Sequence, residues 1–149
     1  MSNTIIKNKK AFFEYEVLES FEAGIALKGT EVKNLRLGKV KMVDAFCQVN
    51  KSGELILHQM EIQQYSHGNI HNHHPKRDRK LLMHRREIVR LEQRAKEKGL
   101  SIIPISLYFK GGKVKVSIAL AKGKKLHDKR ASLKEKDAKR EIDREMKGG

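Results

Sequence analysis

Two clusters of cationic side chains carry the strongest chemical signal in this sequence. The first is the run Pro75-Lys76-Arg77-Asp78-Arg79-Lys80. The second covers residues 122–125 and 128–130, with His127 between its two parts. Guanidinium and ammonium groups donate hydrogen bonds to phosphate oxygens, so both clusters predict binding to a phosphate backbone. The alternatives are a solvated charged turn for the first cluster and a solubilising tail for the second.

The distribution of charge favours a polyanionic partner. The 149 residues include 33 Lys and Arg against 18 Asp and Glu, which gives a formal net charge of +15. Residues 1–75 carry a net charge of only +1, whereas residues 76–98 carry +6 and residues 122–149 carry +5. An excess concentrated in a central stretch and a tail is typical of a protein that binds nucleic acid.

Catalytic and metal-binding motifs are weak by comparison. The loop histidines His67, His71, His73 and His74 lack the cysteine or carboxylate partners that usually complete a transition-metal site. Cys47 is the only cysteine and is expected to be a small buried hydrophobic residue. Glu22 and Glu31 are assigned to salt bridges. The sequence therefore predicts no enzyme, no metal and no cofactor, and a metalloenzyme such as a nuclease, built on the histidine loop, is the alternative.

The hydrophobic pattern predicts a small β-barrel with helices packed on it. Residues 12–27 alternate with the period of a strand, with a bulge or bend expected at Gly24, and residues 45–59 and 102–120 read as hairpins. Residues 30–37 read as a short helix capped by Thr30, and the segment after Asp78 reads as a long helix that ends at Gly99. An open β-sandwich is the alternative architecture.

Three segments are expected along the chain. Residues 1–10 lack periodicity and are predicted to be flexible, and residues 11–121 form the barrel domain. Residues 122–149 are predicted to be a disordered basic tail with a hinge near Gly123, because like charges four residues apart weaken an isolated helix. The tail carries a thin apolar stripe and is expected to become helical on a polyanionic surface.

The aromatic residues, the length of the apolar runs and the single cysteine indicate which partner and which cellular compartment to expect. Most of the eight aromatic residues are predicted to face the core, which leaves few stacking platforms for single strands and favours recognition of a folded RNA by its shape. The longest apolar runs are too short to span a bilayer, no secretory signal is visible, and a lone cysteine suits a reducing compartment. We therefore expect a cytoplasmic protein without a membrane partner.

Several motifs in order along the chain resemble one protein family. They are Asn8-Lys9-Lys10-Ala11, the long string from Phe21-Glu22-Ala23-Gly24 to Glu31-Val32-Lys33, Arg77-Asp78-Arg79-Lys80-Leu81-Leu82, Ser106-Leu107-Tyr108 and Gly123-Lys124-Lys125-Leu126-His127-Asp128-Lys129-Arg130. Together they resemble SmpB, the family of tmRNA-binding proteins, and the match spans nearly the whole chain.

The resemblance implies a fold, a function and a set of site residues. The fold would be an oligonucleotide-binding (OB) barrel with flanking helices, and the function would be non-catalytic delivery of tmRNA to stalled ribosomes in trans-translation. The partners would be the tRNA-like domain of tmRNA, the decoding centre and messenger channel of the small ribosomal subunit, and elongation factor Tu with alanyl-tmRNA. The matching RNA-binding positions are Asn8, Lys9, Glu22, Arg77, Arg79, Lys80 and Leu82. The matching tail positions, which would probe the decoding centre, are Gly123, Lys124, Lys125, His127, Asp128, Lys129 and Arg130. A general OB-type RNA binder without preference for tmRNA is the alternative.

Overall fold

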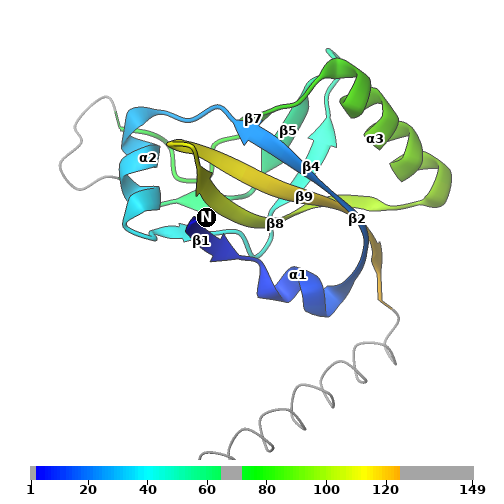
Figure 1. The fold of residues 1–149 in the computed structure, drawn as a ribbon, viewed down its shortest axis with the longest axis horizontal. Helices are drawn as coiled ribbons and strands as arrows, with labels where there is room; N and C mark the ends of the chain where they lie inside the picture. The colour runs from blue at the N-terminus through cyan, green and yellow to red at the C-terminus, as the bar shows by residue number, and fades with distance from the viewer. Residues whose placement is uncertain (1–2, 65–71, 125–149) are drawn as a thin grey trace, which may run out of the picture.

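The computed structural model describes residues 3–64 and 72–124 (Figure 1). The strands are β1 (Asn3–Lys7), β2 (Tyr15–Ile25), β3 (Val40–Lys41), β4 (Phe46–Val49), β5 (Leu55–His58), β6 (Glu61–Ile62), β7 (Arg79–Leu82), β8 (Ser101–Lys110) and β9 (Lys113–Gly123). The helices are α1 (Lys9–Glu14), α2 (Gly29–Arg36) and α3 (Arg85–Lys98). Within these two ranges, the apolar stretches of the helices all fall short of the length of a membrane span.

A closed antiparallel sheet forms the centre of the molecule. Its strand order is β1-β8-β4-β5-β7-β2-β9, and an additional pairing of β8 with β9 joins the two sides of the sheet. Ile118 of β9, for example, lies opposite Phe21 of β2 and also opposite Pro104 of β8. Closure leaves few exposed strand edges. The predicted barrel with flanking helices is confirmed, and the open sandwich is wrong.

Parts of the strands β8 and β9 are covered on both of their faces. Inward side chains such as Leu107 and Ile118 join the main core, whereas Ile103 and Ala119 join a second cluster that includes Ala11 of α1. Because α1 lies against the outer face of part of these strands, residues 102–105 of β8 and 118–121 of β9 are buried in continuous runs, whereas residues 113–117 of β9 alternate.

The N-terminal residues are part of the fold. β1 pairs antiparallel with β8, from Asn3 opposite Phe109 to Lys7 opposite Ser106. The prediction that residues 1–10 are flexible is therefore wrong for residues 3–10. The strand escaped detection because its register shifts between Thr4 and Ile6, which interrupts the alternation of a regular strand. Residues 9–14 form α1, so the long strand begins at Tyr15 and not near residue 12.

The segment before the long helix is a strand. β7 lies between β5 and β2, and its Leu81 pairs with Leu55 on one side and with Ile25 on the other. The helix predicted to follow Asp78 begins only at Arg85, although it ends as predicted, with Gly99 in the left-handed conformation at φ 61°. Leu81 fits both the helical and the strand period, and the buried Arg79 conceals the alternation. The apolar pattern therefore could not separate the two assignments.

The turns follow the predicted chemistry, with two corrections. The β8–β9 turn places Gly111 and Gly112 at φ 58° and 76°, as a primed hairpin turn requires. The short helix α2 begins one residue earlier than predicted and has Lys28 as its N-cap, so Thr30 does not cap it. Gly24 lies in regular pairing with Leu82 and Lys115, and the irregularity of β2 falls between Val17 and Glu19.

The last described residues continue the barrel. Gly123 pairs with Tyr15, and the backbone N–H of Lys124 donates a hydrogen bond of 2.9 Å to the carbonyl oxygen of Glu14. The expected boundary at residue 122 is therefore too early by about two residues, and Gly123 lies within a strand and not at a hinge. The rest of the predicted tail, residues 125–149, lies outside the described residues.

Candidate RNA-binding site

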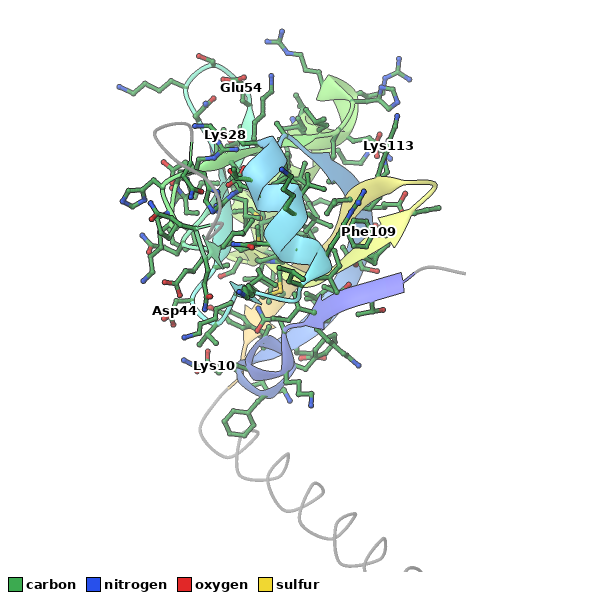
Figure 2. All side chains as sticks on the ribbon, turned by 90° about the vertical axis from the view of Figure 1, so that its left-hand side faces the viewer. Lys10, Lys28, Asp44, Glu54, Phe109 and Lys113 are labelled. Carbon is green, nitrogen blue, oxygen red and sulfur yellow. The ribbon has the colours of Figure 1, made fainter. Side chains whose placement is uncertain are left out.

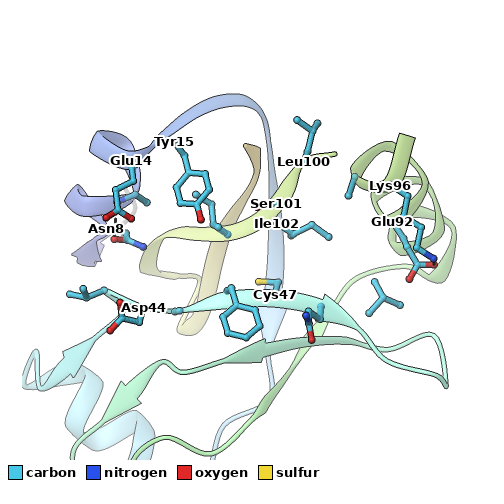
Figure 3. A pocket seen from close by; sticks show the side chains of 18 residues that line it. Asn8, Glu14, Tyr15, Asp44, Cys47, Glu92, Lys96, Leu100, Ser101 and Ile102 are labelled. Carbon is cyan, nitrogen blue, oxygen red and sulfur yellow. Dashed lines mark hydrogen bonds and ion pairs between the residues drawn. The ribbon is translucent and has the colours of Figure 1, made fainter. Parts of the chain in front are cut away.

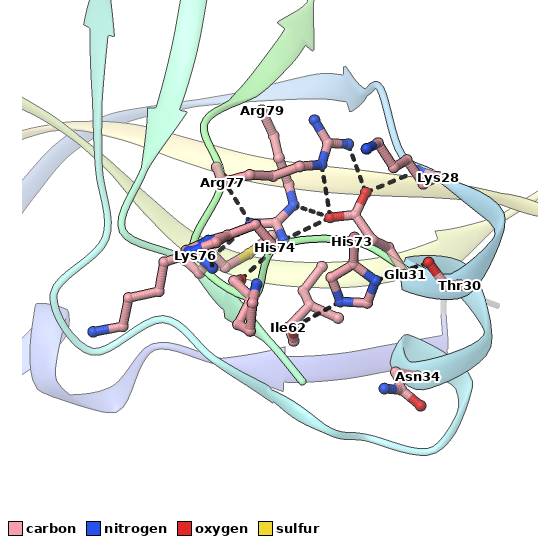
Figure 4. A network of polar contacts seen from close by, with 12 residues as sticks. Lys28, Thr30, Glu31, Asn34, Ile62, His73, His74, Lys76, Arg77 and Arg79 are labelled. Atoms are coloured by element: carbon pink, nitrogen blue, oxygen red, sulfur yellow. Dashed lines mark hydrogen bonds and ion pairs between the residues drawn. The ribbon is translucent and has the colours of Figure 1, made fainter. Parts of the chain in front are cut away.

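A buried carboxylate organises the first cationic cluster (Figure 4). Glu31 of α2 is fully buried, and its Oε1 accepts hydrogen bonds of 2.8 Å from the Lys28 backbone N–H and 2.6 Å from Arg77 Nη2. Its Oε2 accepts from Arg79 Nε at 2.6 Å and from Arg77 Nε at 3.1 Å. Both carboxylate oxygens are therefore fully used, and the predicted salt-bridge role of Glu31 is confirmed.

The guanidinium of Arg79 is also enclosed. Its Nη1 donates to the carbonyl oxygens of Met60 at 2.7 Å and Arg77 at 3.1 Å, and its Nη2 donates to that of Pro75 at 3.1 Å. The side chain is 0% exposed. In this structure the guanidinium is thus bound within the protein, and the expected contact of Arg79 with RNA stays a prediction. Because β7 alternates its side chains, Arg79 and Leu81 point inward while Lys80 and Leu82 point outward.

Charge complementarity holds this network ionised. Burial by itself raises the pKa of Glu31, but the hydrogen bonds from Arg77, from the Lys28 backbone and from Arg79 outweigh it, so the pKa lies below its ordinary value. Burial lowers the pKa of Arg79, and Glu31 opposes that change. The network fixes α2 against the start of β7, which positions the exposed residues that follow.

His73 belongs to the same buried region and is not a metal ligand in this arrangement. Its Nε2 lies 2.8 Å from the carbonyl oxygen of Ile62, so Nε2 donates, and its Nδ1 then accepts from the Thr30 hydroxyl at 2.8 Å. Both ring nitrogens are occupied. Among residues 3–64 and 72–124, no group of three or more potential ligands could hold a metal. His67 and His71 lie outside the described residues, and His74 is exposed.

The outer face of β7, β2 and β9 presents an exposed leucine beside cations. Gly24 of β2 pairs with Leu82 on one side and with Lys115 on the other, so these three residues lie in a row across the sheet. A Cβ on Gly24 would lie 3.2 Å from the Leu82 Cβ, so the absence of a side chain lets Leu82 lie close over the strand. Leu82 is 52% exposed.

Glu22 is held in place at the edge of this row. Its Oε2 accepts a hydrogen bond of 2.6 Å from the Tyr108 hydroxyl, and the Lys110 Nζ lies 3.2 Å from the same oxygen. These two hydrogen bonds, that of Tyr108 first, lower the pKa of Glu22. Burial and then Glu22 raise the pKa of Tyr108 to about 12. The predicted salt bridge of Glu22 is confirmed, and the carboxylate remains exposed.

These residues border a groove of about 680 Å³. Its lining includes Glu22, Gly24, Lys80, Leu82, Arg85 and Lys115. Lys80 Nζ forms an ion pair with Glu54 at 2.8 Å. In Figure 2 the labelled residues Glu54 and Lys113 lie at the surface of the protein. The groove thus combines exposed cations for phosphates, an apolar side chain for a base or sugar face, and one oriented carboxylate that can accept from a base N–H.

The other expected RNA-binding positions do not line this groove. Asn8 is 5% exposed, and its amide donates to the carbonyl oxygens of Met42 and Pro104 while its Oδ1 caps α1 at the Ala11 N–H. Asn8 is therefore used inside the protein, which leaves the exposed Lys9 as the accessible residue of the pair. Arg77 is partly exposed, but its Nη2 and Nε are bound to Glu31.

The aromatic residues differ from the prediction. Among the seven that are described, none is fully buried, and Phe12 and Phe46 are exposed. Phe46 stacks on His58 with ring centroids 5.1 Å apart, and Phe21 and Phe109 pack against the edge of the core. The small barrel interior is filled by aliphatic side chains, which leaves the rings at its rim. Cys47 is buried as predicted.

The chain matches known proteins over nearly its whole length. The family model described as "SmpB protein" matches residues 5–148. The chain belongs to the SmpB family. Similar proteins include the SsrA-binding protein of Carboxydothermus hydrogenoformans. It is 52% identical over 147 residues, which cover 99% of this chain and 98% of that protein. The SsrA-binding protein of Aquifex aeolicus is 54% identical and covers 97% of this chain and 92% of its own length.

A solved structure of an SmpB protein shares the fold. It is described as "tmRNA-SmpB: a journey to the center of the bacterial ribosome", with 41% identity, a TM-score of 0.65 and coverage of 89% of this chain and 93% of its own. The family inferred from the motifs is thereby confirmed.

Several residues in or beside the groove were not predicted as site residues from the sequence. Tyr108 and Lys110, which bind Glu22 beside the groove, lie on β8, whereas the groove residues Lys115 and Arg85 lie on β9 and α3. Only the closure of the barrel brings them near Glu22 and Leu82. The available signal was the period of two in β9, which places Lys113 and Lys115 on the face opposite Val114 and Val116.

Proposed function

We propose that this chain binds tmRNA, the SsrA RNA, and works with it on stalled bacterial ribosomes in trans-translation, in which the nascent peptide is tagged for degradation. Membership of the SmpB family carries this proposal, since the chain is similar to SsrA-binding proteins from end to end. A solved relative described with tmRNA and the bacterial ribosome supports it. The chain acts by binding RNA, without catalysis, in the cytoplasm.

The groove between β2, β7, β9 and the start of α3 is the surface that grips the tRNA-like domain. Lys80, Arg85 and Lys115 contact phosphates, and Leu82 packs on an exposed base or sugar. Phosphates are repelled by Glu22, so this carboxylate accepts a hydrogen bond from a base N–H and fixes the register of the RNA. Arg77, Arg79 and Asn8 support the surface from within the protein.

The C-terminal segment serves the ribosome. Its cations, from Lys124 to Arg130 and beyond, bind ribosomal RNA phosphates where an empty messenger channel leaves them accessible. The barrel delivers alanyl-tmRNA together with elongation factor Tu, and the segment reports that no messenger occupies the decoding centre.

Competition binding tests the proposal. The purified full chain is bound to the labelled tRNA-like domain of tmRNA at moderate salt and challenged with unlabelled bulk tRNA. We expect tmRNA to be retained, because specific contacts persist when non-specific phosphate contacts weaken. Equal competition by bulk tRNA would contradict the proposal and favour a general RNA-binding protein.

A further inference from the structure

Two further hollows of the barrel differ in what lines them. The larger one, of about 740 Å³, is lined by α1, β4, the start of β8 and the end of α3 (Figure 3). Its carboxylates are already paired within the protein. Lys10 Nζ lies 3.8 Å from Glu14 and 3.6 Å from Asp44, and Lys96 Nζ lies 3.8 Å from Glu92. Because its exposed lining is also mainly polar, this hollow offers a ligand neither a surplus of charge nor a broad apolar surface.

The smaller hollow, here named the α2 pocket, is apolar and cationic. It has a volume of about 330 Å³ and lies between α2, the end of β2 and the turn from β8 to β9. Most of its exposed lining is apolar, with side chains that include Ile25, Leu27, Val32 and Val114. Among the described residues that line it, Lys113 and Lys115 are the charged ones, and none is a carboxylate. The α2 pocket therefore suits a ligand that joins an apolar group to an anion.

The α2 pocket is continuous with the groove between β2, β7, β9 and the start of α3. Gly24, Leu82 and Lys115 line both of them. A Cβ on Gly24 would lie 3.5 Å from Leu82 Cδ1, so the Leu82 side chain lies against the backbone of β2 at the border of the two hollows. An RNA chain that follows the groove past Leu82 therefore reaches the mouth of the α2 pocket.

A single nucleotide matches both the lining and the size of the α2 pocket. It carries a flat ring with apolar faces and a phosphate on the same sugar, but the ring is accessible only when the base has left its stack. A volume of about 330 Å³ is at the lower end for ligand pockets, so it admits one base and not a helix or a strand. An acidic peptide with an apolar side chain has similar chemistry, but the continuity with the groove favours RNA.

We propose that the α2 pocket holds one extruded base of the RNA bound in the groove. Leu82 then packs on the neighbouring nucleotide that stays in the groove, and Lys113 and Lys115 contact the flanking phosphates. This role rests on the proposed function and adds a requirement to it: the RNA must present an unpaired nucleotide at a fixed distance from the phosphates held in the groove. A regular duplex lacks such a nucleotide and binds through its backbone alone.

Fluorescence of the base analogue 2-aminopurine tests for the extruded base. The full-length protein is mixed with the tRNA-like domain of tmRNA, in which one unpaired nucleotide at a time is replaced by this analogue, whose fluorescence rises when it leaves a stack. We expect a rise at one position on binding, because the described lining of the α2 pocket contains no aromatic ring on which the base could stack again. In Val32→Phe, which fills the pocket from its half-buried wall, the rise should disappear. Affinity should fall about 10-fold, as expected when the apolar face of one base is no longer buried.

Matched variants separate filling of the pocket from damage to the fold. Val32→Ala leaves the pocket open and should keep the rise. Val89→Phe adds the same ring at an exposed position of α3 outside the pocket and should change nothing. Leu27→Phe fills the pocket from the segment before α2 and repeats the test if Val32→Phe does not fold. In the filled variants the slope of log affinity against log salt should stay the same, because no phosphate contact is lost.

The outcomes distinguish this role from the proposed function. A rise that persists in the filled variants, or no rise at any position, would overturn the extruded base. Unchanged RNA affinity in the filled variants would do the same and would favour an acidic peptide as the occupant. In each of these cases the tRNA-like domain would still be retained against bulk tRNA, whereas failure of the proposed function would appear as equal competition by bulk tRNA.

Discussion

At the scale of single residues, Glu31 is the centre of the polar structure. One buried carboxylate neutralises two arginines and also accepts from the N-terminal backbone of its own helix. Buried charges are tolerated when they are paired and fully hydrogen-bonded. If one partner is lost, the desolvation penalty of the remaining buried charge is no longer compensated. The network therefore fixes the start of β7 from within the protein.

Replacement of Glu31 with glutamine should destabilise the protein strongly. Removing the charge leaves Arg79 buried without a counter-charge, so we expect a loss of about 3–5 kcal/mol in the free energy of unfolding at pH 7, measured by urea denaturation. The control is Glu54→Gln, which breaks the exposed pair with Lys80 and should cost less than about 1 kcal/mol. Equal losses of stability in the two variants would show that the buried network of Glu31 contributes no more to stability than the exposed pair of Glu54 and Lys80.

The stability that Glu31 contributes to the wild type, relative to Glu31→Gln, should depend on pH. Because the pKa of Glu31 is lowered by folding, its stabilisation is present above its ordinary pKa of 4.5 and is lost as the pH falls through the lower folded value. The difference in stability between the wild type and Glu31→Gln should therefore shrink below about pH 4.5.

Tyr108 positions Glu22, and its hydroxyl can be removed selectively. In Tyr108→Phe the largest cause of the lowered pKa of Glu22 is gone, so the pKa should rise toward 4.5 in a carbon-detected NMR titration. Affinity for the tRNA-like domain should fall about 3- to 10-fold, since the carboxylate loses one orienting hydrogen bond. Tyr15→Phe, on the same barrel but away from Glu22, should change neither quantity. A Glu22 pKa that stays low in Tyr108→Phe would assign its orientation to Lys110 alone.

At the scale of elements, the alternation of β7 separates support from recognition. Lys80 and Leu82 face the groove while Arg79 faces the core, so mutations of neighbouring residues must act differently. This division predicts which cations contribute to the salt dependence of RNA binding.

The triple variant Lys80→Ala, Arg85→Ala and Lys115→Ala should reduce the slope of log affinity against log salt by about 2–3 without unfolding the protein. Measurement of tmRNA binding at several salt concentrations tests this. A matched triple of exposed lysines outside the groove, Lys39, Lys41 and Lys98, should leave the slope nearly unchanged. Similar slopes for both triples would place the RNA elsewhere on the barrel.

The end of β9 determines how far the chain can be truncated from its C-terminus without loss of stability. Truncation after Lys124 should leave stability within about 0.5 kcal/mol and tmRNA affinity nearly intact, yet abolish tagging on stalled ribosomes. Truncation after Ala121 removes the pairings of Lys122 and Gly123 with β2 and should cost a further 1–3 kcal/mol or so. Thermal melts, binding and a tagging assay distinguish the cases. Loss of tmRNA binding together with tagging after the first cut would contradict separate roles for barrel and tail.

At the scale of the whole molecule, burial is uneven around the barrel. The central residues of β8 and β9 pack on the core with one face and beneath α1 with the other. The β3–β6 sheet, by contrast, consists of two residues on each strand. Local opening costs most where both faces are buried.

Hydrogen exchange should reproduce this order. Backbone amides of Ile118 to Ala121 should exchange slowest and approach the global free energy of unfolding, whereas those of Val40 and Lys41 should exchange fastest among the strands. Exchange measured by NMR on the free protein gives these rates directly. Equal protection of the two regions would contradict the uneven distribution of stability.

Much of this protein follows from local patterns in the sequence. The two hairpins, the end of α3 at Gly99, the burial of Cys47 and the family motifs depend on residues close together in the chain, where turn chemistry and period act directly. The strand β1 and the strand β7 were missed because their pairing partners lie far away in sequence. A short strand with an irregular register or a buried arginine is stabilised by those partners and not by its own propensity.

The sequence by itself determined the class of partner, since cations concentrated in two segments attract phosphate wherever the chain places them. Only the tertiary structure decided which cations are available for RNA. Arg79 and Lys80 are neighbours of the same charge, yet closure of the barrel buries one against Glu31 and exposes the other beside Leu82. The physical reason is that desolvation depends on what packs around a side chain, and that is set by residues distant in sequence.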